Sequence, residues 1–225
     1  MQNMIDTVLF DWDGTLIDSA QHAFIAFQKT LIDFGIPIQQ QIYERIYSPN
    51  WYRMYEDLGL PQEKWKEADD RWIQYYAGAS SRMMPGVEAA LNELARKGYA
   101  IGIVTSGSRE RVLGEVNDLK LTDVFRIVIC SEDVVNRKPH PEGLQIAMKR
   151  LGKEPVACCY VGDSPDDIEM GKRARVLTIG IPGRYPASRR LPNSNPDLYF
   201  PSLEHFLLKM ETLPHFPRSH AAAQS

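Results

Sequence analysis

The sequence predicts an α/β protein with a doubly wound, mostly parallel sheet and an inserted all-helical domain. Three observations point to this fold class. Short runs rich in Val and Ile recur along the chain, helical patterns separate most of them, and residues 18–82 carry helical signal without a convincing strand. Continuous apolar runs are typical of parallel strands buried on both faces. Their alternation with helices is typical of a doubly wound sheet.

Five strands and four helices account for this alternation. The strands are predicted at Met4–Phe10, Tyr99–Thr105, Arg126–Cys130, Val156–Gly162 and Val176–Ile181. The helices are expected to begin near Gly86, Ser108, Pro141 and Ser164. The third helix should end at Gly152, because glycine is common just beyond a helix C-terminus.

The helical stretch that follows the first strand predicts a second domain inserted into the first. Turn signals at 34–37, 48–50 and 59–61 divide this stretch into about four helices. We expect a cap domain at 18–81 and a core domain at 1–17 and 82–212, with hinges at 17–19 and 80–85. Residues 182–197 are expected to form a long loop, and residues 213–225 a flexible tail.

Composition and charge exclude several classes of protein. The chain has 225 residues, of which 44% are hydrophobic, and a formal net charge of −3. This charge does not favour binding to nucleic acid or to an anionic membrane. The apolar runs are too short to span a membrane, and the N-terminus lacks the pattern of a signal peptide. Three cysteines without regular spacing fit a reducing cytoplasm. We therefore expect a cytoplasmic protein, either a monomer or a homodimer.

Polar residues follow four of the predicted strands. They are Asp11 and Asp13 after the first strand, Thr105, Ser106 and Gly107 at the end of the second, Lys138 after the third, and Asp163, Asp166 and Asp167 after the fourth. Ligands of open α/β sheets bind beyond the carboxyl ends of the strands, so these side chains should converge there. The acids would repel one another unless a hard cation and an anionic substrate were bound. Oxygen ligands without His or Cys favour Mg²⁺.

This set of residues suits phosphoryl transfer to a carboxylate. Asp11 would attack phosphorus and form an aspartyl-phosphate, while Asp13 would protonate the leaving alcohol and later take a proton from water. Mg²⁺ held by Asp11 and Asp163 would neutralise phosphate charge.

Phosphate oxygens would be held by the residues after the second strand. Thr105 and the N–H groups of Ser106 and Gly107 would bind them, and Lys138 would add positive charge. The metal ion and Lys138 together should keep Asp11 ionised.

Four strings carry a family resemblance. They are "DWDGT", "IVTSG", "RKPHP" and "VGDSPDD", in this order and each after a predicted strand. From Val8 to about Ile181 the chain resembles the haloacid dehalogenase superfamily, specifically its phosphoglycolate phosphatase-like members with a helical cap. The resemblance implies a Rossmann-like core and a Mg²⁺-dependent phosphatase acting on a small phosphorylated metabolite. It also implies that the carbonyl of Asp13 is a metal ligand, that Asp163 binds the metal directly, and that Asp167 supports the site from behind.

The strings leave more than one reaction open. A sugar-phosphate mutase of the beta-phosphoglucomutase type shares all of them. A dehalogenase is disfavoured, because it needs neither Asp13 nor the metal-binding acids. A phosphonate-cleaving enzyme would need an amine-forming lysine in the cap, and Lys29, Lys64 and Lys66 stand in no telling pattern. From another class, a non-catalytic sensor of phosphorylated ligands would not need the intact Asp11 and Asp13.

Substrate choice is expected to depend on the cap. The resemblance places a specificity loop near Tyr47–Gly59, where Arg53 is a cation beside Trp51 and Tyr52. The planar fork of Arg53 suits a carboxylate or a second phosphate on the leaving group. A solvated helix arginine is the alternative. The expected partner is thus a small phosphorylated metabolite, and neither nucleic acid nor a membrane.

Overall fold

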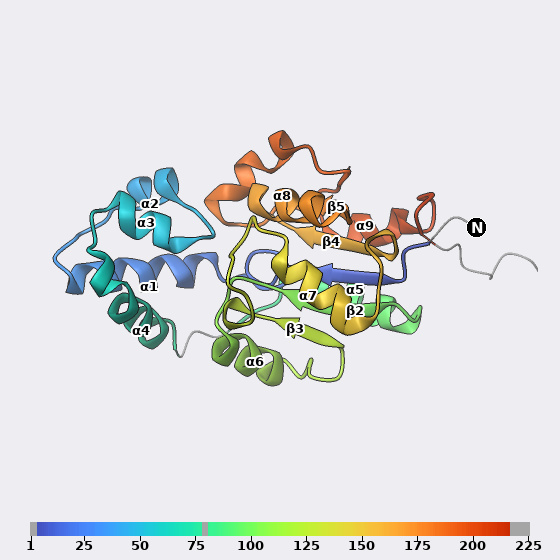
Figure 1. Cartoon of the computed structure of the whole chain (residues 1–225), viewed down its shortest axis with the longest axis horizontal. Helices are drawn as coiled ribbons and strands as arrows, with labels where there is room; N and C mark the ends of the chain where they lie inside the picture. The colour runs from blue at the N-terminus through green and yellow to red at the C-terminus, as the bar shows by residue number, and fades with distance from the viewer. Residues whose placement is uncertain (1–3, 78–80, 217–225) are drawn as a thin grey trace, which may run out of the picture.

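A six-stranded parallel sheet lies at the centre of the molecule, in the order β3-β2-β1-β4-β5-β6 (Figure 1). The structure is a computed structural model and describes residues 4–77 and 81–216. The strands are β1 Thr7–Phe10, β2 Ala100–Val104, β3 Ile127–Ile129, β4 Cys158–Gly162, β5 Leu177–Gly180 and β6 Leu198–Tyr199. The chain runs from β1 to β2 and β3 on one side of the sheet and continues at β4 on the other side of β1, so the order reverses between β1 and β4. The carboxyl ends of β1 and β4 therefore flank the crevice in which such folds bind ligands.

All five predicted strands are present, each shorter than expected at one or both ends. The sixth strand was missed because it has only two residues, and one of them, Tyr199, is 46% exposed. Adjacent residues of β1 point to opposite faces of the sheet, as the period of a strand requires. Val8 and Phe10 contribute to one apolar cluster, whereas Leu9 contributes to the other.

Helices cover both of these faces. The core helices are α5 Val87–Arg96, α6 Arg109–Asp118, α7 Glu142–Leu151, α8 Pro165–Ala174 and α9 Leu203–Met210. Buried residues of α5, α6 and α9 belong to the cluster that contains Phe10, and those of α7 and α8 pack mainly in the cluster that contains Leu9. The predicted doubly wound fold is confirmed.

Four further α-helices of the described chain form the inserted cap. They are α1 Ala20–Asp33, α2 Gln40–Ile46, α3 Trp51–Asp57 and α4 Trp65–Tyr76, with a short 3-10 turn, η1 Gln62–Lys64, before the last. They have an apolar cluster of their own, which includes Phe27, Leu31 and Tyr55. Figure 1 shows these helices beyond the ends to which the arrows of β1 and β4 point.

Two chain segments run side by side between the core and the cap. The N–H of Asp18 donates to the carbonyl of Arg82 at 2.8 Å, and the N–H of Met84 donates to that of Leu16 at 2.8 Å. The hinges expected at 17–19 and 80–85 fall on these segments, although residue 80 lies outside the described residues.

The C-terminal region is more ordered than the sequence suggested. Residues 182–197 were expected to form a loop, but Pro186–Ser194 form a 3-10 segment, η4. The tail expected from 213 onward is corrected in its first residues. Phe216 is buried against Phe206, and the N–H of Ile5 donates to the carbonyl of His215 at 2.8 Å. Residues 217–225 lie outside the described residues.

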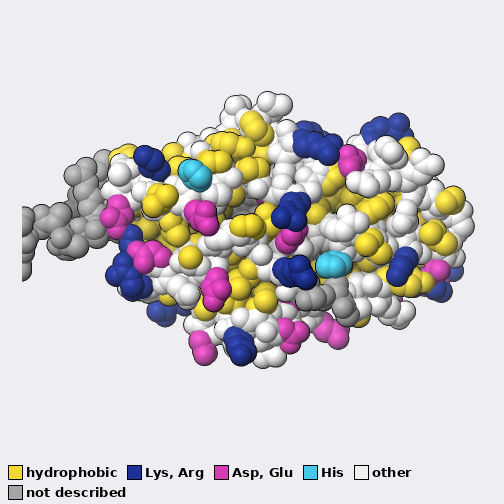
Figure 2. Space-filling view, turned by 180° about the vertical axis from the view of Figure 1, so that it is seen from behind, with side chains coloured by type: hydrophobic (Ala, Val, Ile, Leu, Met, Phe, Trp, Pro, Cys, Tyr) yellow, Lys and Arg dark blue, Asp and Glu magenta, His cyan; other side chains and the backbone are white. Residues whose placement is uncertain are grey.

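Two surface properties agree with the composition. On the face drawn in Figure 2, acidic and basic side chains are interspersed rather than gathered by sign. Among the described residues, no helix is both long enough and apolar enough to cross a bilayer. All three cysteines are buried and free.

Candidate active site

Asp11 lies just beyond the central strand, beside the ammonium group of Lys138. Its N–H donates to the carbonyl of Val161 at 2.9 Å, which continues the ladder between β1 and β4. The residue is 5% exposed, and Lys138 Nζ lies 2.6 Å from Asp11 Oδ1. Burial raises the pKa of Asp11 to about 7, and the positive charge of Lys138 opposes this rise.

Three buried carboxylates meet at this edge of the sheet. Asp11, Asp163 and Asp167 each offer an oxygen, and these oxygens lie within 4.8 Å of one another. Burial raises the pKa of Asp163 well above its usual value, and the charges of Asp167 and Asp11 raise it further. Lys138 supplies one positive charge to this group, which leaves negative charge in excess when the acids are ionised. A hard divalent cation would offset that excess.

Two glycines allow the backbone to pack closely against Asp163. Gly14 has a φ of +88°, and a Cβ there would lie 2.6 Å from Asp163 Oδ2, while a Cβ at Gly183 would lie 2.3 Å from the same oxygen. Either side chain would displace the carboxylate. Ser188 Oγ lies 2.7 Å from Asp163 Oδ2 and fixes its orientation. The three carboxylates, with Asp163 held in this orientation, fit a small cation with oxygen ligands.

Asp167 holds both Lys138 and the first turn of α8. Its Oδ1 accepts from Lys138 Nζ at 2.7 Å, and its Oδ2 accepts from the N–H of Ser164 at 3.1 Å and from Ser164 Oγ at 2.6 Å. In return, the N–H of Asp167 donates to Ser164 Oγ, so the two residues form a capping box. The start of this helix therefore fixes the position of the lysine.

The loop after β2 brings the predicted phosphate-binding residues to the same place. Thr105 is 6% exposed, and its N–H donates to the carbonyl of Ile129 at 2.9 Å. Thr105 Oγ1 accepts from the N–H of Gly107 at 3.0 Å. Thr105, Ser106 and Gly107 line the cavity that also reaches Asp11. The structure thus gathers the residues that follow β1, β2, β3 and β4, as the sequence predicted.

Asp13 contacts a different set of residues. Arg111 Nη1 donates to Asp13 Oδ1 at 3.0 Å, and Arg111 Nη2 contacts Asp13 Oδ2. Ser19 Oγ donates to Asp13 Oδ1 at 2.7 Å and lies 2.9 Å from the hydroxyl of Tyr185. Both carboxylate oxygens of Asp13 are therefore engaged as hydrogen-bond acceptors.

Arg111 lies in the site although no string in the sequence pointed to it. Its side chain is 9% exposed, and its Nη1 lies 3.1 Å from Glu115 Oε2, which also accepts from Trp12 Nε1 at 2.6 Å. Burial alone would lower the pKa of Arg111, but the charges of Asp13 and Glu115 outweigh burial and hold it well above its usual value. The spacing of Arg111 and Glu115, four apart on the helix after the phosphate loop, was the available signal.

A cavity of about 350 Å³ connects these residues with the cap. Its core side includes Asp11, Asp13, Thr105, Arg111 and Lys138. Its cap side is mainly aromatic and includes Phe27, Tyr43, Tyr47, Trp51, Tyr55 and Trp72. A substrate in this cavity would lie with its reacting end against the strand ends and its other end under the aromatic rings.

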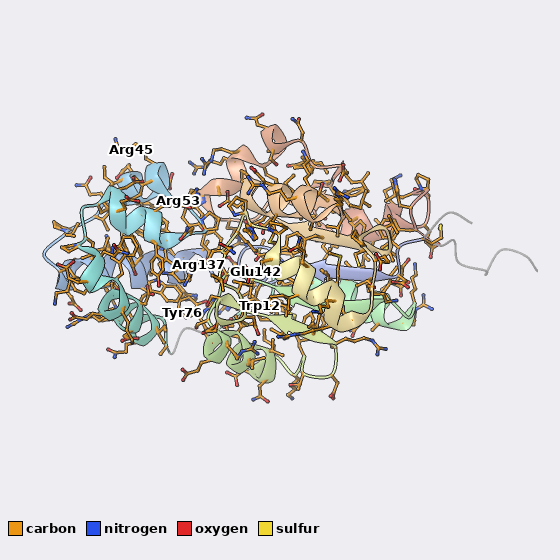
Figure 3. All side chains as sticks on the ribbon, in the orientation of Figure 1. Trp12, Arg45, Arg53, Tyr76, Arg137 and Glu142 are labelled. Atoms are coloured by element: carbon orange, nitrogen blue, oxygen red, sulfur yellow. The ribbon has the colours of Figure 1, made fainter. Side chains whose placement is uncertain are left out.

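Arg137 reaches from the core to the cap (Figure 3). Its guanidinium carbon lies 4.7 Å from the ring centroid of Trp51 and 4.6 Å from that of Tyr52. Asp69 accepts from Trp51 Nε1 at 2.8 Å and from the hydroxyl of Tyr52 at 2.7 Å. These bonds hold Asp69 at the cap side of the cavity.

Arg53 lies outside this arrangement. Its side chain is exposed on α3 (Figure 3), and its charge acts on Asp166, where it opposes the burial that raises the pKa of that acid. Among the described residues that line the cavity, the arginines are Arg111 and Arg137. The assignment of Arg53 to the substrate stays a prediction that these contacts do not support.

Residues 8–181 match the model of the haloacid dehalogenase-like hydrolase family. The chain belongs to this family. A curated member from Salmonella paratyphi A, named phosphoglycolate phosphatase, is 29% identical over 96% of this chain and 95% of its own length. Pyrophosphatase PpaX of Bacillus pumilus is 29% identical over 92% of this chain and 96% of its own.

Solved structures of haloacid dehalogenase-like proteins share the fold. A predicted phosphoglycolate phosphatase from Haemophilus somnus superposes with a TM-score of 0.81 at 22% identity, covering 92% of this chain and 97% of that one. A putative beta-phosphoglucomutase from Thermotoga maritima superposes with a TM-score of 0.70 at 22% identity, covering 93% of this chain and 100% of that one. At these identities the likeness concerns the fold, and it confirms the capped α/β architecture expected from the sequence.

Proposed function

We propose that this haloacid dehalogenase-like hydrolase is a Mg²⁺-dependent phosphatase that releases phosphate from a small phosphorylated metabolite through an aspartyl-phosphate on Asp11. The observation that carries the proposal is the contact of Lys138 with Asp11 at the centre of three buried carboxylates. Relatives named phosphoglycolate phosphatase and pyrophosphatase support a phosphorylated substrate.

Asp11 would act as the nucleophile. Lys138 holds its Oδ1, so Oδ2, which lies 3.4 Å from the hydroxyl of Thr15, is the oxygen that attacks phosphorus. The bond from phosphorus to the leaving oxygen breaks as the bond to Asp11 forms, and Asp13 gives its proton to the leaving oxygen. A water molecule then attacks the phosphorus, Asp13 takes its proton, and phosphate and free Asp11 result.

The remaining residues hold the charges of the phosphoryl group. The hydroxyl of Thr105 and the N–H groups of Ser106 and Gly107 would bind its oxygens, together with Lys138. Asp11, Asp163 and the carbonyl of Asp13 would hold Mg²⁺, which neutralises phosphate charge when bound. Asp167 acts through Lys138, whose ammonium it keeps in place.

The surroundings fit an enzyme of the cytoplasm. Three buried free cysteines suit a reducing compartment. The mixed surface charge favours neither nucleic acid nor a membrane as partner. We propose that the enzyme acts there as a monomer or homodimer.

A panel of phosphorylated metabolites, assayed for released phosphate with Mg²⁺, tests the proposal. We expect turnover of p-nitrophenyl phosphate and of at least one small phosphomonoester, and none by Asp11→Asn at unchanged circular dichroism. Labelled phosphate should be trapped on Asp11. Turnover that persists in excess chelator, or label on another residue, would refute the proposal. Isomerised sugar phosphate without released phosphate would indicate a mutase.

A further inference from the structure

Arg111 is paired with Asp13, the residue that the proposed reaction needs as a proton donor. Its two Nη atoms contact both oxygens of Asp13, one of which also accepts from Ser19. A carboxyl group that protonates a leaving oxygen must present one of its own oxygens to it. With both oxygens engaged as acceptors, Asp13 is not available to a substrate in this arrangement.

The surroundings of Arg111 form a built site rather than a chance contact. A Cβ at Gly107 would lie 2.4 Å from Arg111 Nη2, so the glycine of the phosphate loop leaves the space that the guanidinium fills. Glu115 holds the guanidinium from the other side and is itself held by Trp12 Nε1. Arg111 Nε is buried without a hydrogen-bond partner among the described residues.

Arg111 also faces the part of the cavity where the leaving group would lie. Its guanidinium carbon lies 5.0 Å from the ring centroid of Tyr76 and 5.8 Å from that of Trp72, both on α4 of the cap. It lines the cavity together with Asp13 and Trp72. Figure 3 labels Tyr76 of α4, whose ring lies beside Arg111, and Trp12 of the core, which donates to Glu115.

We propose that Arg111 determines substrate specificity by moving from Asp13 to a second anionic group on the leaving portion of the substrate. The inference rests on the proposed phosphatase function and names the class of substrate: a phosphomonoester whose leaving group carries a carboxylate or a further phosphate. A guanidinium binds either anion through two parallel hydrogen bonds. Binding of that anion releases Asp13, so the acid becomes available when such a substrate is present.

Two substrates that differ in one group test this proposal. They are 2-phosphoglycolate and ethyl phosphate, which have similar leaving groups with and without a carboxylate. We expect the unaltered enzyme to favour 2-phosphoglycolate by at least about tenfold in kcat/KM, with part of the difference in kcat. In Arg111→Gln, turnover of 2-phosphoglycolate should fall and that of ethyl phosphate should hold or rise, so that the preference shrinks to less than about twofold. An unchanged preference, or equal losses on both substrates, would overturn the proposal.

A matched control and a second variant keep the test independent of folding. Arg109→Gln removes an arginine two positions away that is 40% exposed and pairs with Asp133, and it should leave the preference unchanged. Arg111→Gln leaves Glu115 without its cation, so the double variant with Glu115→Gln serves if the single variant unfolds. The double variant should show the same collapse of preference.

Acetate tests the mechanism on the unaltered protein. Free acetate should occupy Arg111, release Asp13 and raise the hydrolysis of ethyl phosphate severalfold, whereas chloride of equal ionic strength should not. No activation by acetate would contradict the proposed exchange of partners.

Binding separates this inference from the proposed function. Calorimetry on Asp11→Asn, which needs no turnover, should show that 2-phosphoglycolate binds more tightly than ethyl phosphate and that Arg111→Gln removes the difference. If neither compound is hydrolysed but this difference is present, the phosphatase proposal fails and the anion site stands. If both compounds are hydrolysed but bind alike, the anion site fails.

Discussion

Ser188 Oγ lies 2.7 Å from Asp163 Oδ2 and 2.7 Å from the carbonyl oxygen of Asp163, so a residue of η4 holds the acid that follows β4. The same hydroxyl accepts from the N–H of Gly183 at 3.0 Å. Residues that orient a metal ligand in this way affect metal affinity although they do not touch the metal.

Ser188→Ala should therefore weaken metal binding more than it weakens the fold. We expect the Mg²⁺ concentration for half-maximal activity to rise about tenfold, with kcat recovered at high Mg²⁺. Ser194→Ala is the matched control. Ser194 lies in the same segment, and among the described residues its Oγ bonds only the carbonyl of Leu191. A similar Mg²⁺ requirement in both variants would show that Ser188 has no role at the metal.

Replacing Asp163 and replacing Asp167 should have different effects on activity and on stability. Asp163→Ala removes a proposed direct ligand and should abolish turnover at any practical Mg²⁺ concentration. Asp167→Ala should be partly rescued by added Mg²⁺, but it also removes half of the capping box with Ser164 and should lower the free energy of unfolding by about 1 kcal/mol or more. Activity titrations and urea unfolding measure the two effects. Greater rescue of Asp163→Ala than of Asp167→Ala would exchange the proposed roles.

The buried acids predict how stability depends on pH without metal. Burial raises the pKa of Asp11 to about 7, above its value in the unfolded chain, so between these values the folded state binds more protons than the unfolded state. The contribution of Asp11 to stability should thus be fully present below the unfolded pKa and should be lost as pH rises through about 7. Bound Mg²⁺ offsets the ionised acids, so it should raise Tm more at pH 8 than at pH 5.

Asp11→Asn supplies the control for this dependence. The amide does not ionise, so the metal-free variant should lose less stability than the unaltered enzyme between pH 5 and pH 8. Thermal unfolding in chelator measures both proteins. Equal slopes would mean that Asp11 does not titrate in this range.

Much of the site was predictable from the sequence because it depends on the ends of parallel strands. Asp11, Thr105, Lys138 and Asp163 each follow a strand that the apolar runs reveal, and parallel strands bring their carboxyl ends to one edge. The capping box of α8 was also open to prediction, since Ser164 stands three residues before Asp167.

Other residues could not be placed, because their roles depend on packing. Ser188 lies between Pro186 and Pro192 in a segment whose composition predicts a loop. Arg111 and Glu115 have the spacing of an ordinary surface pair on a helix, and only the packing of α6 against the core brings Arg111 to Asp13. For Arg53, the sequence pattern could not show that the side chain is exposed on α3.

Arg137 and Arg53 provide the last prediction, which compares a partly buried arginine with an exposed one. Arg137 lies over Trp51 and Tyr52, so Arg137→Gln removes two cation–π contacts that join the core to α3. Contacts of this kind contribute about 0.5–2 kcal/mol each, so we expect KM for small phosphomonoesters to rise by about threefold to tenfold, with a smaller change in kcat. Arg137→Lys should restore part of the loss, because an ammonium group also binds ring faces. Arg53 lies on the same helix as the two rings, but its side chain is exposed. We therefore expect Arg53→Gln to change kcat/KM less than about twofold. A tenfold loss in Arg53→Gln, confined to substrates with a second anion, would instead support the sequence-based assignment of Arg53 and leave Arg137 a residue of the fold.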